Sequence, residues 1–315
     1  RTRINSAQLH VDYGGGSRWN GFLVLDRLAV GDIEMEDVTL NMGGIARNLD
    51  DPSTRDVTLS AEGLATGVWA ADPDVARALG TRIDLFADAA LPPGGPGRIR
   101  QLQISGNGLS IFSAGTIEDW VYSGRNAARI DDITPFGGIA GRDLDGAVDF
   151  RANGSVNLLG GGFDLALDGT ATDLRIGDDR VDNLLAGETT LAGRVARDET
   201  GIRAEGLRLG NAQISFASDG QISTRRTDIG FTASVTDLGL IDPRLGGAAS
   251  ARGTARGGAG SVDVTLAAEI PEGHLLDRTL AGAKLGFDGT VARGAVNGGV
   301  WKRPDGHGRV VVMRE

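Results

Sequence analysis

The three histidines are the first candidates for metal chemistry. His10, His274 and His307 are far apart and lack the spacing that brings ligands to one ion, and the chain contains no cysteine. The run from Gly160 to Asp164 resembles a calcium-binding nonapeptide, but it lacks the glycine spacing and is not repeated in tandem. We expect a hairpin turn there, and neither a metal site nor a cofactor.

Catalytic signatures are also missing from the sequence. There is no Gly-x-Ser-x-Gly elbow, and the only lysines, Lys284 and Lys302, stand in Ala-Lys-Leu and Trp-Lys-Arg rather than in a phosphate-binding loop. Adjacent carboxylates such as Asp131 and Asp132 are typical of solvated loops rather than of general acids. The sequence therefore predicts that the chain is not an enzyme.

Charge and composition exclude two further classes of protein. The net charge of −10 disfavours the cationic surface that nucleic acid requires. With 4 Trp, 2 Tyr and 9 Phe in 315 residues, the chain lacks the aromatic girdles of a transmembrane barrel. The 50 glycines separate periodic runs in a chain that is 40% hydrophobic, so we expect it to fold.

Apolar and polar residues alternate in short runs along most of the chain. Phe163, Leu165 and Leu167 share one parity, as do Phe231 and Val235. Side chains of a strand alternate between the two faces of its sheet, so each run predicts a strand with one apolar face. The predicted strands span residues 57–64, 82–87, 98–105, 108–113, 147–159, 162–169, 172–176, 189–196, 202–209, 212–217, 227–237, 261–269 and 283–291.

Turn signals separate these runs. Asp-Gly at 168–169, 219–220, 288–289 and 305–306, and Asn-Gly at 297–298, are typical of tight hairpin turns, so we expect antiparallel neighbours. Short helical turns are expected at 74–80, 135–141, 181–187, 241–246 and 275–282. Their irregular intervals favour degenerate repeats in an elongated array.

A one-sided sheet must either fold its apolar face onto itself or fill it with a ligand. The residues expected on that face are Leu102, Ile104, Val148, Phe150, Val156, Leu158, Phe163, Leu165, Leu167, Leu207, Leu209, Ile214, Phe216, Ile229, Phe231, Val235, Val262, Val264, Leu266, Leu285 and Phe287.

Several stretches resemble the translocation and assembly module subunit TamB family. They are residues 132–150, which include Pro135-Phe136-Gly137, residues 157–174, residues 184–216, and the turn at 238–246 with Asp242-Pro243-Arg244-Leu245. The resemblance covers nearly the whole chain. It rests on a style of repeat and on no catalytic motif, so it assigns no role to a single residue.

The resemblance implies an all-β fold in which an elongated, curved antiparallel sheet forms a U-shaped hydrophobic groove, the β-taco of AsmA-like and bridge-like lipid transfer proteins. It also implies a parent protein that is anchored in the inner membrane and crosses the periplasm. Its partners would be phospholipid acyl chains and, through parts outside this chain, an outer-membrane barrel of the Omp85 type (TamA-like). The implied roles are phospholipid transport between the inner and outer membranes and support of outer-membrane protein assembly.

The physics of the strands agrees with a groove. About 20 strands spaced ~4.8 Å apart would form a trough on the order of 100 Å long. Each exposed CH₂ group of a lipid costs ~0.8 kcal/mol in water, which a continuous apolar lining would offset. The groove-lining residues would then be those listed above.

No linker divides the sequence. We therefore expect residues 1–315 to form a single elongated, repeat-built segment, an internal or excised fragment of a larger envelope-spanning protein. An alternative is a closed β-solenoid of an adhesive or carbohydrate-active secreted protein, in which the apolar face would form a dry core.

Overall fold

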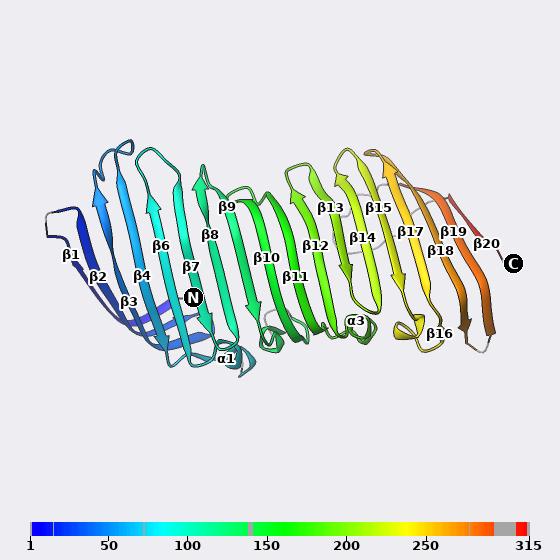
Figure 1. The fold of residues 1–315 in the computed structure, drawn as a ribbon, viewed down its shortest axis with the longest axis horizontal. Coiled ribbons are helices and arrows are strands. Elements are labelled where there is room, and N and C mark those ends of the chain that lie inside the picture. Colours follow the sequence, from blue (N-terminus) through cyan, green and yellow to red (C-terminus); the bar gives the residue numbers. More distant parts are fainter. Residues whose placement is uncertain are drawn as a thin grey trace. The chain divides into compact units, whose positions relative to one another are not determined.

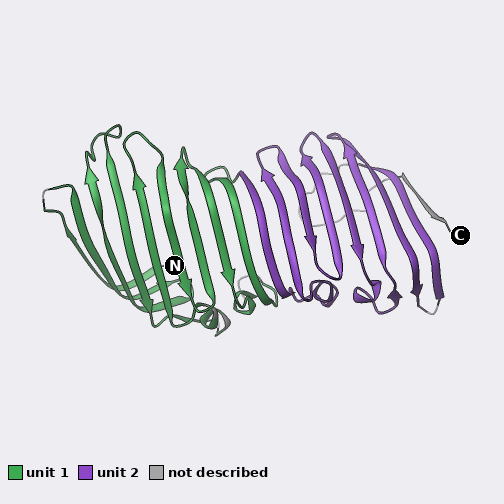
Figure 2. Cartoon of the chain, in the orientation of Figure 1, with its two compact units in different colours: residues 1–161 green, residues 162–315 purple. Residues whose placement is uncertain are grey.

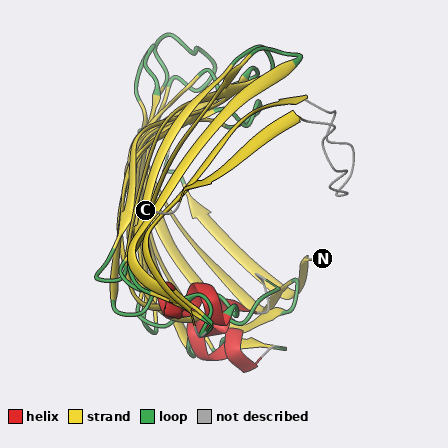
Figure 3. Ribbon diagram, turned by 90° about the vertical axis from the view of Figure 1, so that its right-hand side faces the viewer, coloured by secondary structure: helices red, strands yellow, loops and turns green. Residues whose placement is uncertain are grey.

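The computed structural model describes residues 2–14, 16–71, 73–137, 141–276, 278–292 and 307–313. The chain divides into two compact units, residues 1–161 and residues 162–315, each built almost entirely of antiparallel β-strands (Figure 2). In each unit the sheet is curved, and short helices lie at one end of the strands (Figure 3). The predicted all-β class and the antiparallel pairing are confirmed, and short helical turns occur between some of the strands.

Unit 1 forms one sheet in which each long strand pairs with the next (Figure 1). The short β5 pairs with β3 instead, so β4 pairs directly with β6. The elements are β1 (Thr2–Asp12), β2 (Arg18–Val30), β3 (Ile33–Arg47), β4 (Asp56–Thr66), β5 (Trp69–Ala70), α1 (Pro73–Leu79), β6 (Arg82–Leu91), β7 (Gly97–Gly106), β8 (Leu109–Glu118), β9 (Val121–Ile130), the 3₁₀ helix η1 (Thr134–Phe136) and β10 (Asp145–Asn157).

Unit 2 repeats this plan. Its long strands again pair with their neighbours, and the short β16 pairs with β18, so β15 pairs with β17. The elements are β11 (Phe163–Arg175), α3 (Asp179–Leu184), β12 (Glu188–Arg197), β13 (Gly201–Gly210), β14 (Ile214–Ser223), β15 (Thr227–Val235), the 3₁₀ helix η2 (Leu238–Leu240), β16 (Leu245–Gly246), β17 (Ala249–Gly257), β18 (Ser261–Leu275), β19 (Arg278–Ala292) and β20 (His307–Met313).

The turn predictions from Asp-Gly pairs are wrong wherever the structure describes them. The pairs at 168–169, 219–220 and 288–289 lie inside β11, β14 and β19, and those at 297–298 and 305–306 fall outside the described residues. At Gly220 the reason is local: its φ is +133°, and a Cβ there would collide with the backbone oxygen of Asp228 on β15. This glycine permits a close approach of two strands rather than a reversal of the chain.

The helical turns at the strand ends hold much of the core. Val75 of α1, Val68, Ala70 and Ile133 are buried together at this end of unit 1, and Pro135 of η1 is fully buried. In unit 2, the carboxylate of Asp178 accepts a hydrogen bond from the Arg180 amide and caps α3. Two of the predicted helical turns are wrong. At 241–246 the 3₁₀ helix η2 has already ended at Leu240 and the range closes in strand β16, and at 275–282 Leu275 ends β18 and Arg278 begins β19.

Candidate functional site

The strand register decides which side chains share a face, because residues directly opposite one another on paired strands point the same way. In unit 2 it brings bulky apolar side chains from successive strands onto one face, which we call the apolar face of the unit. All of the predicted residues of this unit lie there, namely Phe163, Leu165, Leu167, Leu207, Leu209, Ile214, Phe216, Ile229, Phe231, Val235, Val262, Val264, Leu266, Leu285 and Phe287.

Unit 1 has an apolar face of its own. Leu102, Ile104, Val148, Phe150 and Val156 share it through the pairings of β7 to β10. Leu158 does not join them, because β10 ends at Asn157 and this leucine is 51% exposed in the following turn. The alternation of apolar and polar residues continues in the sequence beyond Asn157, so it did not reveal that the strand ends there.

Sequence reasoning missed other members of both faces. They are Leu23, Leu40, Leu59, Leu85 and Ile111 in unit 1 and Leu191, Val195, Ile202 and Ile222 in unit 2. Leu23 and Leu40 lie in β2 and β3, which were not predicted as strands, although Leu23 and Leu25 keep the same parity. The alternation of apolar and polar residues at every second position was therefore the signal that could have identified these residues.

A bulge in β13 keeps one face apolar across a change of parity. Ile202 and Ala204 have even numbers and Leu207 and Leu209 odd ones, yet all four face the same way. The extra residue lies next to Gly206, whose φ is +56°, and the Asp219 carboxylate accepts a hydrogen bond from its amide. Such a bulge reverses the side-chain alternation without breaking the sheet.

The apolar faces have little covering them. Within each unit, the strands contact chiefly their sheet neighbours, and the short helices contact the ends of the strands. Ile202 and Leu285 are 53% and 43% exposed, and Phe231 is half-buried. Among the described residues, the apolar face therefore faces no second layer that could form an ordinary sandwich core.

Small residues shape this surface beside the large ones. Phe231 lies over Gly253 on β17, where a Cβ would collide with the ring, and the Phe216 ring stacks 6.5 Å from it. Every β17 residue on this face is alanine or glycine. On this face, bulky side chains are therefore separated by alanine and glycine residues, over which the surface of the sheet is lower.

One polar cluster interrupts the apolar face of unit 1. Ser113, Tyr122 and Asn126 come together there, with the Ser113 hydroxyl 2.8 Å from the Tyr122 hydroxyl and 2.9 Å from the Asn126 Oδ1. The tyrosine ring covers Gly124, and the Asn126 amide donates to the Ala152 carbonyl at 3.2 Å. Because the cluster satisfies its own hydrogen bonds, it stabilises the sheet and offers no evident ligand site.

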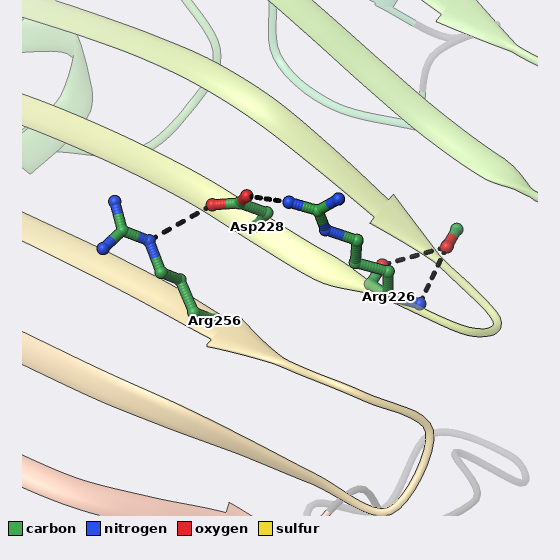
Figure 4. A network of polar contacts seen from close by, with 4 residues as sticks. Arg226, Asp228 and Arg256 are labelled. Atoms are coloured by element: carbon green, nitrogen blue, oxygen red, sulfur yellow. Dashed lines mark hydrogen bonds and ion pairs between the residues drawn. The ribbon is translucent and has the colours of Figure 1, made fainter.

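The opposite face of each sheet, which we call the polar face, carries Arg–Asp pairs. Figure 4 shows Asp228 between two arginines: Arg226 donates to its Oδ2 at 2.6 Å and Arg256 donates to its Oδ1 at 3.3 Å. The hydrogen bond from Arg226, followed by that from Arg256, lowers the pKa of Asp228. Arg194 likewise makes two hydrogen bonds to Asp164, at 2.6 and 2.7 Å, and lowers its pKa. The charged groups of this face are therefore suited to contact with water.

No group of three or more potential metal ligands occurs among the described residues. Trp69 and Trp120 are 55% and 63% exposed and belong to different elements, while Trp301 lies outside the described residues. None of the helices in the described part of the chain is long and apolar enough to span a membrane.

Comparison with known proteins finds no family model, no curated protein and no solved structure that matches this chain. The functional argument therefore rests on the two faces of the sheets.

Proposed function

We propose that this chain is a segment of a non-enzymatic lipid-transfer protein that resembles the TamB family, and that its apolar faces bind the acyl chains of phospholipids. The observation that carries the proposal is the register. It gathers fifteen predicted apolar residues of unit 2 onto one face that is only partly buried. Acyl chains are the ligands that such a continuous, unselective apolar surface fits.

The energetic case follows from the length of a lipid chain. Each CH₂ group that leaves water for an apolar surface gains ~0.8 kcal/mol, so even partial coverage of one chain amounts to several kcal/mol. Alanine and glycine between Phe216, Phe231 and Leu266 leave room for a mobile chain. A sealed β-solenoid remains the alternative, but the exposure of Ile202 and Leu285 favours an open face.

In this proposal the parent protein is anchored in the inner membrane, its groove crosses the periplasm, and phospholipid moves between the two membranes. Support of outer-membrane protein assembly, through an outer-membrane barrel partner, is the other role that the family resemblance suggests. The headgroup would remain outside the apolar face, so we expect binding without headgroup selectivity.

The direct test is extraction of lipid from the purified protein, followed by mass spectrometry, together with titration of a fluorescent acyl probe. The proposal expects co-purified phospholipids in proportions close to those of the source membrane, and displacement of the probe by phosphatidylethanolamine and phosphatidylglycerol alike. A protein that carries no lipid and takes up no probe would contradict it.

A further inference from the structure

The phenylalanines are distributed differently in the two units. In unit 2, every phenylalanine in a described strand lies on the apolar face, as the pairings of Phe163, Phe216, Phe231 and Phe287 show. In unit 1, only Phe150 does so. The other three strand phenylalanines of unit 1 lie on the polar face, where an apolar ring gains nothing from the acyl-binding role proposed above.

These three rings belong to a single row that crosses the strands of unit 1. Each member is the register partner of the next, from β2 through β3, β4, β6 and β7 to β8. In that order the row reads Phe22, Asn41, Glu62, Phe86, Gln103 and Phe112. Aromatic rings thus alternate with side chains that carry amide or carboxylate groups.

The spacing of the rings follows from the spacing of the strands. Neighbouring strands lie ~4.8 Å apart, so Phe86 and Phe112, two strands apart, are separated by about 10 Å along the row. His10 stacks on Phe22 with ring centroids 5.3 Å apart, and the Arg125 guanidinium lies over one face of the Phe112 ring, 5.9 Å from its centroid. At each end of the row, therefore, another side chain already covers one face of the ring.

A hollow lies at the middle of this row. It has a volume of about 450 Å³, and Asn41, Glu62, Phe86 and Gln103 line it together with the neighbouring Asp84. Among the described residues, no side-chain hydrogen bond or ion pair engages the Asn41 amide or the Glu62 carboxylate. Donors and acceptors are thus free at the edge of an aromatic ring.

The chemistry of the hollow selects among ligands. The carboxylates of Glu62 and Asp84 disfavour binding of an anion in the hollow. The nearby Arg82 does not offset them, because it already pairs with Asp84 at 2.6 Å. A bare acyl chain is disfavoured by the polar lining. A sugar ring matches both the aromatic and the polar residues of the hollow. Its axial C–H groups stack on an aromatic face, and its hydroxyls bond to amides and carboxylates.

We propose that the polar face of unit 1 binds a linear β-1,4-linked polysaccharide, which lies along the row and across the strands. Phe86 stacks on one sugar and Phe112 on another, through the face that Arg125 does not cover, and the separation of the two rings is close to one disaccharide repeat of an extended β-1,4-linked chain. Asn41 and Glu62 bond to the hydroxyls of the sugars beside and between the rings. Gln103 does so through its Nε2, since its Oε1 already accepts a hydrogen bond from Gln101 at 3.1 Å. The polysaccharide and the lipid chains occupy opposite faces of the sheet.

The test uses the full chain and isothermal titration calorimetry with chito-oligosaccharides and cello-oligosaccharides from two to six sugars. Affinity should rise up to the length that reaches both rings. Phe86→Ala should weaken hexasaccharide binding roughly tenfold. Phe150→Ala removes a ring from the apolar face of the same unit and should leave sugar affinity unchanged.

Circular dichroism and thermal unfolding establish that each variant is folded. If Phe86→Ala fails to fold, Gln103→Ala serves in its place and should weaken binding several-fold. Absence of saturable binding to both hexasaccharides would overturn the proposal. So would a folded Phe86→Ala protein with full affinity, equal losses from Phe150→Ala, or equal binding of the α-linked, curved maltohexaose.

Discussion

At the scale of single residues, Phe231 and Thr232 are neighbours in β15 that test the assignment of faces. Phe231 points to the apolar face and Thr232 to the polar face, where it is exposed. A carboxylate that faces hydrocarbon costs on the order of 2.5 to 3.5 kcal/mol. We therefore expect Phe231→Asp to weaken binding of a fluorescent acyl probe about thirtyfold or more, and Thr232→Asp to change it little. Equal effects in the probe titration would show that the two faces are wrongly assigned.

Asp228 provides a prediction about pH. Its pKa is lowered in the folded protein by Arg226 and Arg256, so between the folded and unfolded pKa values the unfolded state binds more protons. The stability that the pair contributes is complete above the unfolded pKa of about 3.9 and is lost as the pH falls through the folded pKa. Thermal unfolding of Asp228→Asn between pH 6 and pH 2 should show a shallower decline than that of the unaltered protein. A steeper decline would contradict this sign.

At the scale of the elements, alternation predicted most strands because one face of each carries large apolar side chains. It failed for β17, whose residues on the apolar face are only alanine and glycine. Their small side chains differ little in hydrophobicity from the serine and threonine residues that alternate with them. It also placed turns at Asp-Gly pairs that lie inside strands, because a glycine required for close strand approach has the same sequence signal as one required for a turn. The bulge at Gly206 depends on pairing with both neighbouring strands, which no local pattern reveals.

That bulge gives a matched pair of glycine variants. Gly206 has a φ of +56° with open space around it, so Gly206→Ala meets no collision but must hold alanine in the left-handed region. We expect a loss of about 1–2 kcal/mol in the free energy of unfolding by urea. Gly230 in β15 has ordinary backbone geometry and only one distant neighbour, the Gly253 carbonyl oxygen at 4.0 Å. Gly230→Ala should be neutral or slightly stabilising. If both variants lost the same stability, the bulge would not require its glycine.

At the scale of the whole molecule, the sequence predicted the all-β class and many of the bulky residues that the register places on the apolar face of each unit. It wrongly placed Leu158 on such a face, because this residue has the right parity but β10 ends one residue earlier, at Asn157. It also missed the aromatic row of the polar face, because Phe22, Phe86 and Phe112 become neighbours only through the pairing of six strands.

Stability and lipid binding should respond differently to the same substitutions. Phe150→Asp, Leu165→Asp and Phe216→Asp each place a charge on a half-buried apolar face, where water and mobile lipid can relax around it. From the proposed function we expect folded proteins with small shifts in thermal unfolding, weakened acyl-probe binding, and loss of envelope integrity in cells that carry the altered protein. Wholesale unfolding from each change would instead indicate a sealed core. Unchanged binding and stability would indicate that these side chains do not contact lipid.

Contact between acyl chains and the apolar face is the central claim, and site-specific photo-crosslinking measures it most directly. A photoreactive amino acid at Leu165, on the apolar face of β11, should form phospholipid adducts in cells that produce the protein. The same amino acid at the adjacent, exposed Ala166 should form few or none, because it points to the opposite face. Lipid adducts at Leu165 alone are the result that this account predicts. Equal adducts at both positions, or none at Leu165, would contradict it.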